Sequence, residues 1–280
     1  MPTIAWPQCD ASSVDIKNIY SGQCVVYAPL SPTRQLIDFA LSLVKQHALP
    51  ALEIDSSESS VREFVDAARR IKSEFTNSDL TRQILEKLIF ERYSNYVEYS
   101  LSYDLPRLRI IPNSSILSSG ISYNYKPHRD TWYGADQDQI NHWIAVENVT
   151  SDSTFFIAPS FFDKSVENTS SKFDLDVWDA QFRYKASSSI KREEREHPIP
   201  LQALQNTSML PCAIPPSHEI CFSGHHLHGS LPNTTDQTRL SIDYRVIVSG
   251  FDGLYPNNID SESRGEYSKF LKPHPSFSAN

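Results

Sequence analysis

The chain from about residue 96 to residue 250 is a succession of short apolar segments separated by Pro, Asn and Ser, and this pattern is what most limits its fold. Segments of this length with turn residues between them predict strands. A run of such strands without long helices in between favours an antiparallel barrel of two sheets, a jelly roll, with a ligand at its mouth. The predicted strands are residues 96–100, 108–111, 121–125, 139–146, 155–157, 219–222 and 240–248.

The first hundred residues have a mainly helical pattern. Ser31 followed by Pro32 predicts a helix N-terminus. Apolar residues then recur at helical spacing, and packing against a sheet is the simplest explanation for these apolar stripes. The predicted elements are a strand over residues 23–27 and amphipathic helices over residues 32–47, 60–75 and 79–93.

These patterns predict one domain of the α+β class with a mainly β core. The domain spans residues 1–280, with mostly helical support over 1–95, the jelly-roll core over 96–250 and a C-terminal tail over 251–280.

A polar stretch over about residues 163–210 interrupts the core and is interpreted as an insertion over the barrel. It contains a charged run, residues 187–196, which predicts a solvated helix or loop. A lid over the substrate is the alternative interpretation.

Charge and cysteine content exclude several classes of protein. The chain of 280 residues has 26 basic and 34 acidic residues and a net charge of -8, which argues against a nucleic-acid-binding surface. The four cysteines are far apart and lack the paired spacing of a zinc site. No charged and apolar leader opens the chain, and no run of about eighteen apolar residues occurs. We therefore expect a cytoplasmic protein with reduced thiols and no membrane partner.

A candidate metal site is indicated by His128 and Asp130, which are two positions apart. On an extended segment their side chains project from the same face. With His228 as a distant third ligand they form a set of two histidines and one carboxylate, which leaves half of an octahedron open and suits non-haem Fe(II) with oxygen. The alternative for the first pair is a surface turn in which the carboxylate pairs with Arg129.

Arg239 follows His228 after ten residues that contain a polar turn. Its planar guanidinium can bind a carboxylate through two parallel hydrogen bonds, and Ser241 lies two positions later on the same face. The alternative is an exposed arginine at a strand edge. Alternation also places His226 on the same face as His228, beside the metal ligands or the substrate.

The pattern His128-x-Asp130, with His228 and then Arg239, resembles the Fe(II)/2-oxoglutarate-dependent dioxygenases, and within them the phytanoyl-CoA dioxygenase-like branch. The phrase His-Gly-Ser-Leu-Pro-Asn-Thr that begins at His228 is similar to the second metal segment of that branch. The similarity spans about residues 105–250. It implies a double-stranded β-helix, which is the cupin-like jelly roll. Residues 152–160 depart from the family's glycine-bearing turn, so we expect a different pocket wall there.

The resemblance implies Fe(II), 2-oxoglutarate and O2 as cofactors. The iron would be held by His128, Asp130 and His228, and the distal carboxylate of 2-oxoglutarate by Arg239. The implied reaction converts 2-oxoglutarate to succinate and CO2 and hydroxylates an aliphatic C–H bond, by resemblance one of a small polar metabolite in a specialised biosynthetic pathway. Asp130 argues against a halogenase, in which a small residue replaces this carboxylate. Desaturation, epimerisation and ring closure use the same ligands and stay open.

Further pocket residues are expected around this set. Gln139, Asn141 and Trp143 alternate along one predicted strand. If this face points inward, the amides donate hydrogen bonds to 2-oxoglutarate and Trp143 forms a wall; the resemblance favours Asn141 for this contact. In the opposite interpretation the two amides lie in solvent.

The residues around the first metal segment are expected on the substrate side. Trp132 and Tyr133 would be walls of the pocket, although packing of aromatic side chains in the core explains them almost as well. Lys126, two positions before His128, would meet an anionic group.

Other functions were weighed against the oxygenase. The string His-Arg-Asp also occurs in protein kinases, but the required Asn five residues later is Ala135 here, which excludes a kinase. A non-catalytic ligand-binding jelly roll and a zinc-dependent hydrolase or isomerase on the same three residues are the remaining alternatives. In each case the partner is a small molecule. The sequence indicates no oligomeric state.

Overall fold

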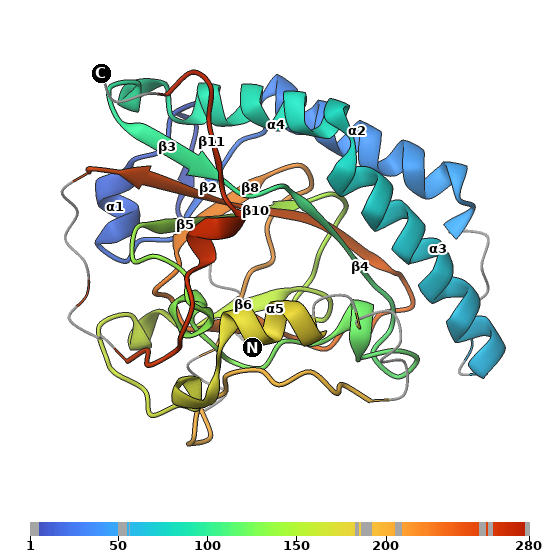
Figure 1. Ribbon diagram of the computed structural model, residues 1–280. Helices are drawn as coiled ribbons and strands as arrows, with labels where there is room; N and C mark the ends of the chain where they lie inside the picture. Colours follow the sequence, from blue (N-terminus) through green and yellow to red (C-terminus); the bar gives the residue numbers. More distant parts are fainter. Residues whose placement is uncertain are drawn as a thin grey trace.

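The protein is described here in a computed structural model that covers residues 6–49, 55, 57–182, 185, 192–204, 209–251, 256 and 260–277. Its core is mainly β-sheet, with several helices packed around it (Figure 1). The large sheet has eight strands in the order β1-β2-β8-β5-β10-β3-β11, with β4 also paired to β10. A smaller sheet has the order β7-β6-β9.

The large sheet consists of β1 (Gln8–Cys9), β2 (Val25–Tyr27), β3 (Ser100–Tyr103), β4 (Arg107–Ile111), β5 (Gln139–Ala145), β8 (Glu219–Ser223), β10 (Arg239–Ser249) and β11 (Lys272–Pro273). The small sheet consists of β6 (Phe155–Ile157), β7 (Leu210–Pro211) and β9 (His228–Ser230). The α-helices are α1 (Ile16–Tyr20), α2 (Ser31–Gln46), α3 (Glu58–Asn77), α4 (Asp79–Arg92) and α5 (Leu175–Phe182).

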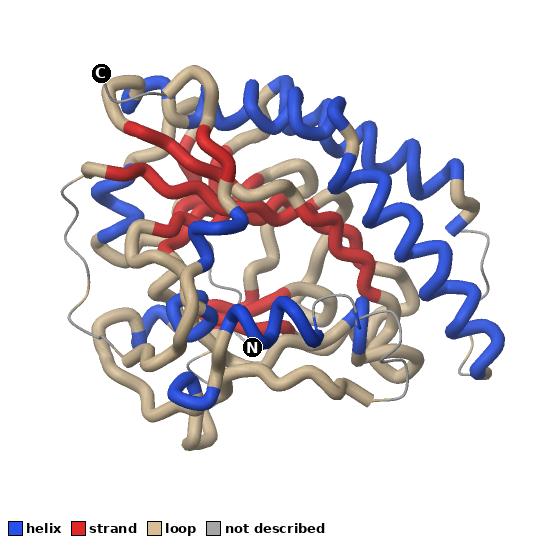
Figure 2. The backbone as a smooth tube through the Cα atoms, viewed as in Figure 1, coloured by secondary structure: helices blue, strands red, loops and turns tan. Residues whose placement is uncertain are grey.

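The predicted long helices are confirmed by α2, α3 and α4, whose ends differ from the expected ones by no more than two residues. Ser31 is already helical, and the N-cap position belongs to Leu30, whose amide donates to Thr33 Oγ1. These three helices lie on one side of the strands (Figure 2). Their apolar stripes and one face of the large sheet form the main hydrophobic core. This arrangement leaves the other face of the sheet for polar side chains.

The long strand β10 divides its residues between the two faces of the sheet. Leu240, Ile242 and Tyr244 point into the core under the helices. Arg239, Ser241, Asp243 and Arg245 alternate with them and therefore point the other way. On its two edges β10 pairs antiparallel with β5 and with β3 and β4, so that the inward polar positions of β4, β5 and β10 form one continuous surface.

A second apolar cluster joins the two sheets. Trp143 of β5 and Phe222 of β8 pack against Phe155 and Ile157 of β6. Phe156 points to the opposite face of β6 and belongs to a third cluster, so β6 follows the two-residue alternation of a strand. The small sheet is thereby held over the polar face of the large one at one end.

Two of the predicted strands are wrong. Residues 94–96 form a 3-10 helix and the strand begins at Ser100, because the amides of Tyr96 and Tyr99 bond locally to Tyr93 and Tyr96. Residues 120–122 are also a 3-10 helix, which begins at Gly120 with φ +60. The alternation of Ile121, Tyr123 and Tyr125 that suggested a strand reflects side chains lining a cavity, not a paired ladder.

The proposed insertion is described only in part. Residues 183–184, 186–191 and 205–208, and with them the first half of the run 187–196, lie outside the described residues. The described part includes α5 and the residues around Arg195, and it contributes side chains to the cavity. The lid and the division into a single domain stay predictions. None of the helices within the described ranges combines the length and apolarity that crossing a bilayer requires.

Candidate metal centre

A cavity of ≈ 440 Å³ lies against the polar face of the large sheet. This volume falls in the range of about 300 to 1,000 Å³ that is usual for small-molecule sites. Its lining combines side chains from β4, β5, β8 and β10 with His228 of β9 and with residues from the connections before β5 and after α5. The cavity is therefore the point at which segments distant in the sequence meet.

His128, Asp130 and His228 come together in this cavity. One ligand atom from each lies within 4.8 Å of the other two. Asp130 Oδ1 is 3.7 Å from His128 Nε2 and 3.7 Å from His228 Nε2. All three side chains are at least mostly buried, and together they present two imidazole nitrogens and one carboxylate oxygen to a common point. Such a donor set is suited to a divalent transition metal.

Backbone hydrogen bonds fix the two histidines beside each other. The amide of His128 donates to the carbonyl of His228 at 2.8 Å, and the reverse bond is 2.9 Å long. This isolated antiparallel bridge continues β9 toward the first metal segment. The sequence analysis placed Asp130 on an extended segment. In the structure, Asp130 instead begins the 3-10 helix Asp130–Tyr133. Its carboxylate nevertheless faces His128.

Each of the two histidines is oriented by its Nδ1. His128 Nδ1 lies 2.8 Å from the carbonyl of Lys126, and His228 Nδ1 lies 2.9 Å from the carbonyl of His226. A carbonyl can only accept, so Nδ1 carries the proton and Nε2 presents its lone pair to the cavity. Burial, helped by His228, lowers the pKa of His128 to about 3, which keeps this imidazole neutral at pH 7. Neutral imidazole is the form that binds a metal.

The carboxylate of Asp130 is oriented by the two amides of β5. Gln139 Nε2 and Asn141 Nδ2 donate to Oδ2 at 2.7 and 2.6 Å, which leaves Oδ1 for the histidine side. Burial by itself would raise the pKa of Asp130, but His228, Arg245 and the Asn141 bond lower it overall. Gln139 and Asn141 therefore face inward, which was one of the two interpretations of the sequence, and both amides bind the carboxylate of Asp130. Their contact with 2-oxoglutarate stays a prediction.

Arg239 lies in the same cavity with little compensation for its charge. The residue is 9% exposed, and its Nε finds no hydrogen-bond partner within the described part of the chain. Burial, with Arg109 nearby, lowers its pKa to about 10, so it is charged at pH 7. Its guanidinium carbon is 6.0 Å from the centre of the Trp143 ring. A buried guanidinium whose Nε has no partner among the described residues is suited to hold an anion.

Ser241, two positions after Arg239 on β10, has a fully buried hydroxyl. The described residues provide no hydrogen-bond partner for its Oγ. A ligand bound at Arg239 is a candidate partner for this hydroxyl, since both residues are on the same face of β10.

Two of the expected substrate-side residues line the cavity. Trp143 does so from β5, and Tyr133 from the end of the 3-10 helix that carries Asp130. The hydroxyl of Tyr133 is 3.1 Å from His197 Nδ1. The ring centres of Tyr133 and His128 are 5.2 Å apart, so Tyr133 covers one side of the metal ligands.

The other three expected substrate-side residues lie elsewhere. Trp132 is fully buried, because its indole packs in the third apolar cluster and donates to Asp260 at 2.7 Å. Lys126 is exposed, and only its backbone carbonyl contributes to the site. His226 lies in a turn that breaks the expected alternation, so its ring packs against Gly22 and Cys24 away from the cavity.

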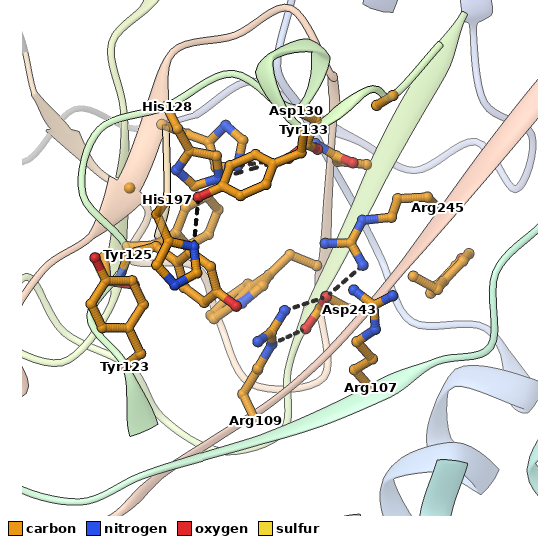
Figure 3. Close-up of a pocket in the computed structure, with 18 of the residues that line it drawn as sticks. Arg107, Arg109, Tyr123, Tyr125, His128, Asp130, Tyr133, His197, Asp243 and Arg245 are labelled. Carbon is orange, nitrogen blue, oxygen red and sulfur yellow. Dashed lines mark hydrogen bonds and ion pairs between the residues drawn. The ribbon is translucent and has the colours of Figure 1, made fainter. Parts of the chain in front are cut away.

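Sequence reasoning missed a group of arginines opposite the metal ligands. Arg107 and Arg109 of β4 and Arg245 of β10 line the cavity and surround Asp243 (Figure 3). Arg109 forms a two-pronged contact with Asp243 at 2.6 and 3.1 Å. The available signal is the alternation of charged with apolar residues in β4 and β10.

A second cluster of possible ligands, His142, Glu219 and Cys221, is buried under the helices. Its carboxylate is already saturated. Arg92 and Tyr244 donate to Glu219 at 2.8 and 2.5 Å, and His142 Nδ1 lies 2.8 Å from it. A metal ion would have to displace these partners, so the cluster is a structural network.

Gly134 ends the helix of Asp130 in the left-handed region, with φ +80. A Cβ at this position would lie 2.7 Å from the backbone carbonyl oxygen of Gly265. Gly134→Ala is therefore expected to lower the free energy of unfolding by about 2 kcal/mol or more, measured by urea denaturation. Gly250, with φ +82 and open space around it, is the matched control, and Gly250→Ala should cost only about 1 kcal/mol. Equal losses would contradict the clash.

No protein-family model matches this chain, and no curated protein matches it. Among solved structures it is similar to EvdO2 from Micromonospora carbonacea var. aurantiaca, with 14% identity, a TM-score of 0.40 and 64% of each chain covered. It spans about two thirds of the length of EvdO2, 64 to 65% in the two structures. Similarity extends to the non-heme monooxygenase ThoJ, with 13% identity, a TM-score of 0.45 and 89% of each chain covered. It also extends to the non-heme alpha ketoglutarate dependent epimerase SnoN from nogalamycin biosynthesis, with 11% identity, a TM-score of 0.39 and coverage of 84% of this chain and 99% of SnoN.

Proposed function

We propose that this protein is a non-haem Fe(II)- and 2-oxoglutarate-dependent oxygenase that acts on a small molecule. The observation that carries the proposal is the presence, in one cavity, of the His128, Asp130 and His228 donor set and the buried guanidinium of Arg239, whose Nε has no hydrogen-bond partner among the described residues. A metal site alone is common to many enzymes. The additional buried anion site is what a co-substrate with a distal carboxylate requires.

The residues present fit this metal and co-substrate. Two neutral imidazoles with Nε2 free and one carboxylate with Oδ1 free provide three ligand atoms on one side, which leaves the cavity side open. The iron and its co-substrate would supply the oxidising power for attack on a C–H bond, which no side chain of the protein can provide.

The chain's own residues perform the binding and the positioning. Arg239 and Ser241 would bind the distal carboxylate of 2-oxoglutarate through their unsatisfied N–H and O–H groups. Gln139 and Asn141 hold the carboxylate of Asp130 in one orientation, which fixes where Oδ1 points. Tyr133 and Trp143 are walls that exclude water from the ligands.

The finer parts of the proposal come from the sequence resemblance. They are the double-stranded β-helix architecture, membership of the phytanoyl-CoA dioxygenase-like branch, and hydroxylation of an aliphatic C–H bond of a small polar metabolite in a specialised biosynthetic pathway. We also propose a cytoplasmic location on the basis of the sequence. The zinc hydrolase or isomerase is the less favoured candidate, because it gives no role to the buried guanidinium of Arg239.

The proposal is tested by adding Fe(II) and 2-oxoglutarate to the protein without oxygen and recording the visible spectrum. A weak metal-to-ligand charge-transfer band is expected, followed by formation of succinate when oxygen is admitted. A zinc enzyme would bind metal but give neither the band nor succinate. Absence of both in protein that retains Fe(II) would rule out the oxygenase.

Arg239→Gln is expected to weaken 2-oxoglutarate binding by roughly tenfold or more, because it removes a charge-assisted pair of hydrogen bonds in a buried site. Titration of the charge-transfer band with 2-oxoglutarate measures this dissociation constant. The matched control is Arg264→Gln, since Arg264 is 70% exposed and pairs with Asp174. Affinity for Fe(II) should be unchanged in both variants. An unchanged 2-oxoglutarate affinity in Arg239→Gln would assign the co-substrate to a different cation.

A further inference from the structure

The charge of the cavity lining differs in sign from that of the chain. The protein as a whole has a net charge of -8. Among the described residues that line the cavity, seven are Arg or Lys and three are Asp. One of the three, Asp130, belongs to the metal ligands and one of the seven, Arg239, to the proposed co-substrate site. The remaining excess of positive charge has no role in the proposed function so far. A concave surface of one sign concentrates ligands of the opposite sign.

Three of these cations come from neighbouring positions on β4 and β10. Arg107, Arg109 and Arg245 share two carboxylates, those of Asp104 and Asp243. Three guanidinium groups thus face two carboxylates, which leaves one positive charge uncompensated within the described part. Both carboxylate contacts of Arg245 use Nη1, at 3.1 Å each. Arg245 is also among the residues that line the cavity.

These arginines are at some distance from the proposed co-substrate anchor. Arg239 and Arg245 are six positions apart on the same face of β10, which is roughly 20 Å along an extended strand. Arg107 is opposite Asp243, and Ile111 is the β4 residue opposite Arg239. One carboxylate cannot contact both Arg239 and Arg245. A second anionic group is therefore needed to bind to Arg107 and Arg245.

The wall that faces this cluster offers aromatic surface and unsatisfied polar atoms. Tyr125 and His197 lie across the cavity from Arg245, close to His128 (Figure 3). The guanidinium carbon of Arg109 is 5.6 Å from the centre of the Tyr125 ring. The rings of Tyr125 and His197 are 5.4 Å apart. His197 Nε2 and Trp178 Nε1 are buried and find no hydrogen-bond partner among the described residues. Tyr133 contacts Nδ1 of His197, so Nε2 can carry the proton and act as a second donor beside the indole N–H.

We propose that the substrate of this site is an anion whose carboxylate or phosphate group binds to Arg107 and Arg245, with an unsaturated body beside the rings of Tyr125 and His197. This substrate proposal rests on the proposed function, because the anion and the metal ligands share one cavity and the oxygenase reaction is what would act on the anion. The body carries an acceptor atom for the donors of His197 and Trp178. Its C–H bonds then lie on the side of His128, where the metal ligands meet.

Binding of simple probes to the full chain, with no metal added, tests the proposal. Benzoate and phenyl phosphate are the anionic probes, and benzamide is the neutral probe with the same ring. Isothermal titration should give at least tenfold tighter binding for one of the anions than for benzamide. The anion that binds more tightly identifies the group as a carboxylate or a phosphate. Quenching of the tryptophan fluorescence is a second readout of the same event, since Trp143 and Trp178 both line the cavity.

Variants assign the binding to the cluster. Arg107→Gln should weaken anion binding by roughly tenfold, because it removes one charge-assisted contact. Its side chain is 33% exposed, so the folded state should tolerate the change, and Arg245→Gln is the second variant. Arg264→Gln at the surface should have no effect. Thermal unfolding of each variant verifies that it is folded.

Two results would overturn the proposal. One is benzamide binding as tightly as both anions. The other is anion binding that is lost in Arg239→Gln and unchanged in Arg107→Gln and Arg245→Gln, which would assign the anion to the co-substrate end. Neither result depends on iron or oxygen. Failure here would therefore be distinguishable from failure of the charge-transfer and succinate experiments.

Discussion

Replacing His128 with alanine is expected to reduce the affinity for Fe(II) by more than roughly a hundredfold and to abolish succinate formation. Loss of a group that only orients a metal ligand already costs about 10- to 100-fold, and this change removes a ligand atom itself. Asp130→Asn should have a similar effect, because a neutral amide replaces the carboxylate that faces both histidines. Competition with a chromophoric chelator under anaerobic conditions measures the affinity.

The matched control is His47→Ala, since His47 pairs with Glu74 on the helical side of the protein. This variant should bind Fe(II) like the wild-type protein. Asn141→Leu is the intermediate case. This change removes one of the two amides that hold Asp130 but no metal ligand. The affinity for Fe(II) is therefore expected to fall by roughly 10- to 100-fold. Binding that survives in His128→Ala and is lost in His142→Ala would move the metal to the second cluster.

Local patterns were sufficient for the elements that support the site. The helices α2, α3 and α4 follow from apolar spacing, because each buries one stripe on the sheet and exposes the rest. The strands β5, β6, β8 and β10 follow from short apolar runs between turns. In each case the periodicity of burial is a property of the element itself, so it is visible in the sequence.

The same reasoning failed where side chains were placed by tertiary contacts. Trp132 and Tyr133 are neighbours, yet only Tyr133 reaches the cavity, since the 3-10 helix turns Trp132 toward Asp260. His226 was expected beside His228 by alternation, but the residues before β9 form a turn. In both cases a local departure from extended backbone changed the direction of the side chains.

The arginine cluster could not be found from spacing. Arg109 is separated from Asp243 by more than a hundred positions, and the contact exists only because β4 pairs with β10. The inward direction of Asn141 was also open, because β5 is buried on both faces and alternation does not say which face meets the cavity. Strand pairing decides both points, and a single sequence does not specify it.

The largest effect on stability is expected from Arg92→Met. Arg92 ends α4, is fully buried and donates to Glu219 of β8 at 2.8 Å. It also donates to the carbonyls of Ser12 and Ala28 at 3.0 and 2.7 Å. Removing it leaves a buried carboxylate without its counter-charge, which typically costs about 3 to 5 kcal/mol. Urea denaturation should show a loss of this size, whereas Arg82→Met on the exposed face of the same helix should cost less than about 1 kcal/mol.

The acid sensitivity of the protein gives this prediction a second readout. Burial by itself would raise the pKa of Glu219, but Arg92 and His142 lower it from 4.5 to about 2. A carboxyl group whose pKa is lowered on folding contributes stability above its ordinary pKa and loses this contribution as the pH falls toward the folded value. The wild-type protein should therefore lose this stabilisation between about pH 4.5 and pH 2. In Arg92→Met the main cause of the lowered pKa is gone, so the free energy of unfolding should be low already at pH 7 and fall less in this window. The prediction would be wrong if Arg92→Met had the stability of the wild-type protein at pH 7 and lost the same free energy of unfolding between about pH 4.5 and pH 2. Arg92 would then not be needed for the contact between α4 and the sheet.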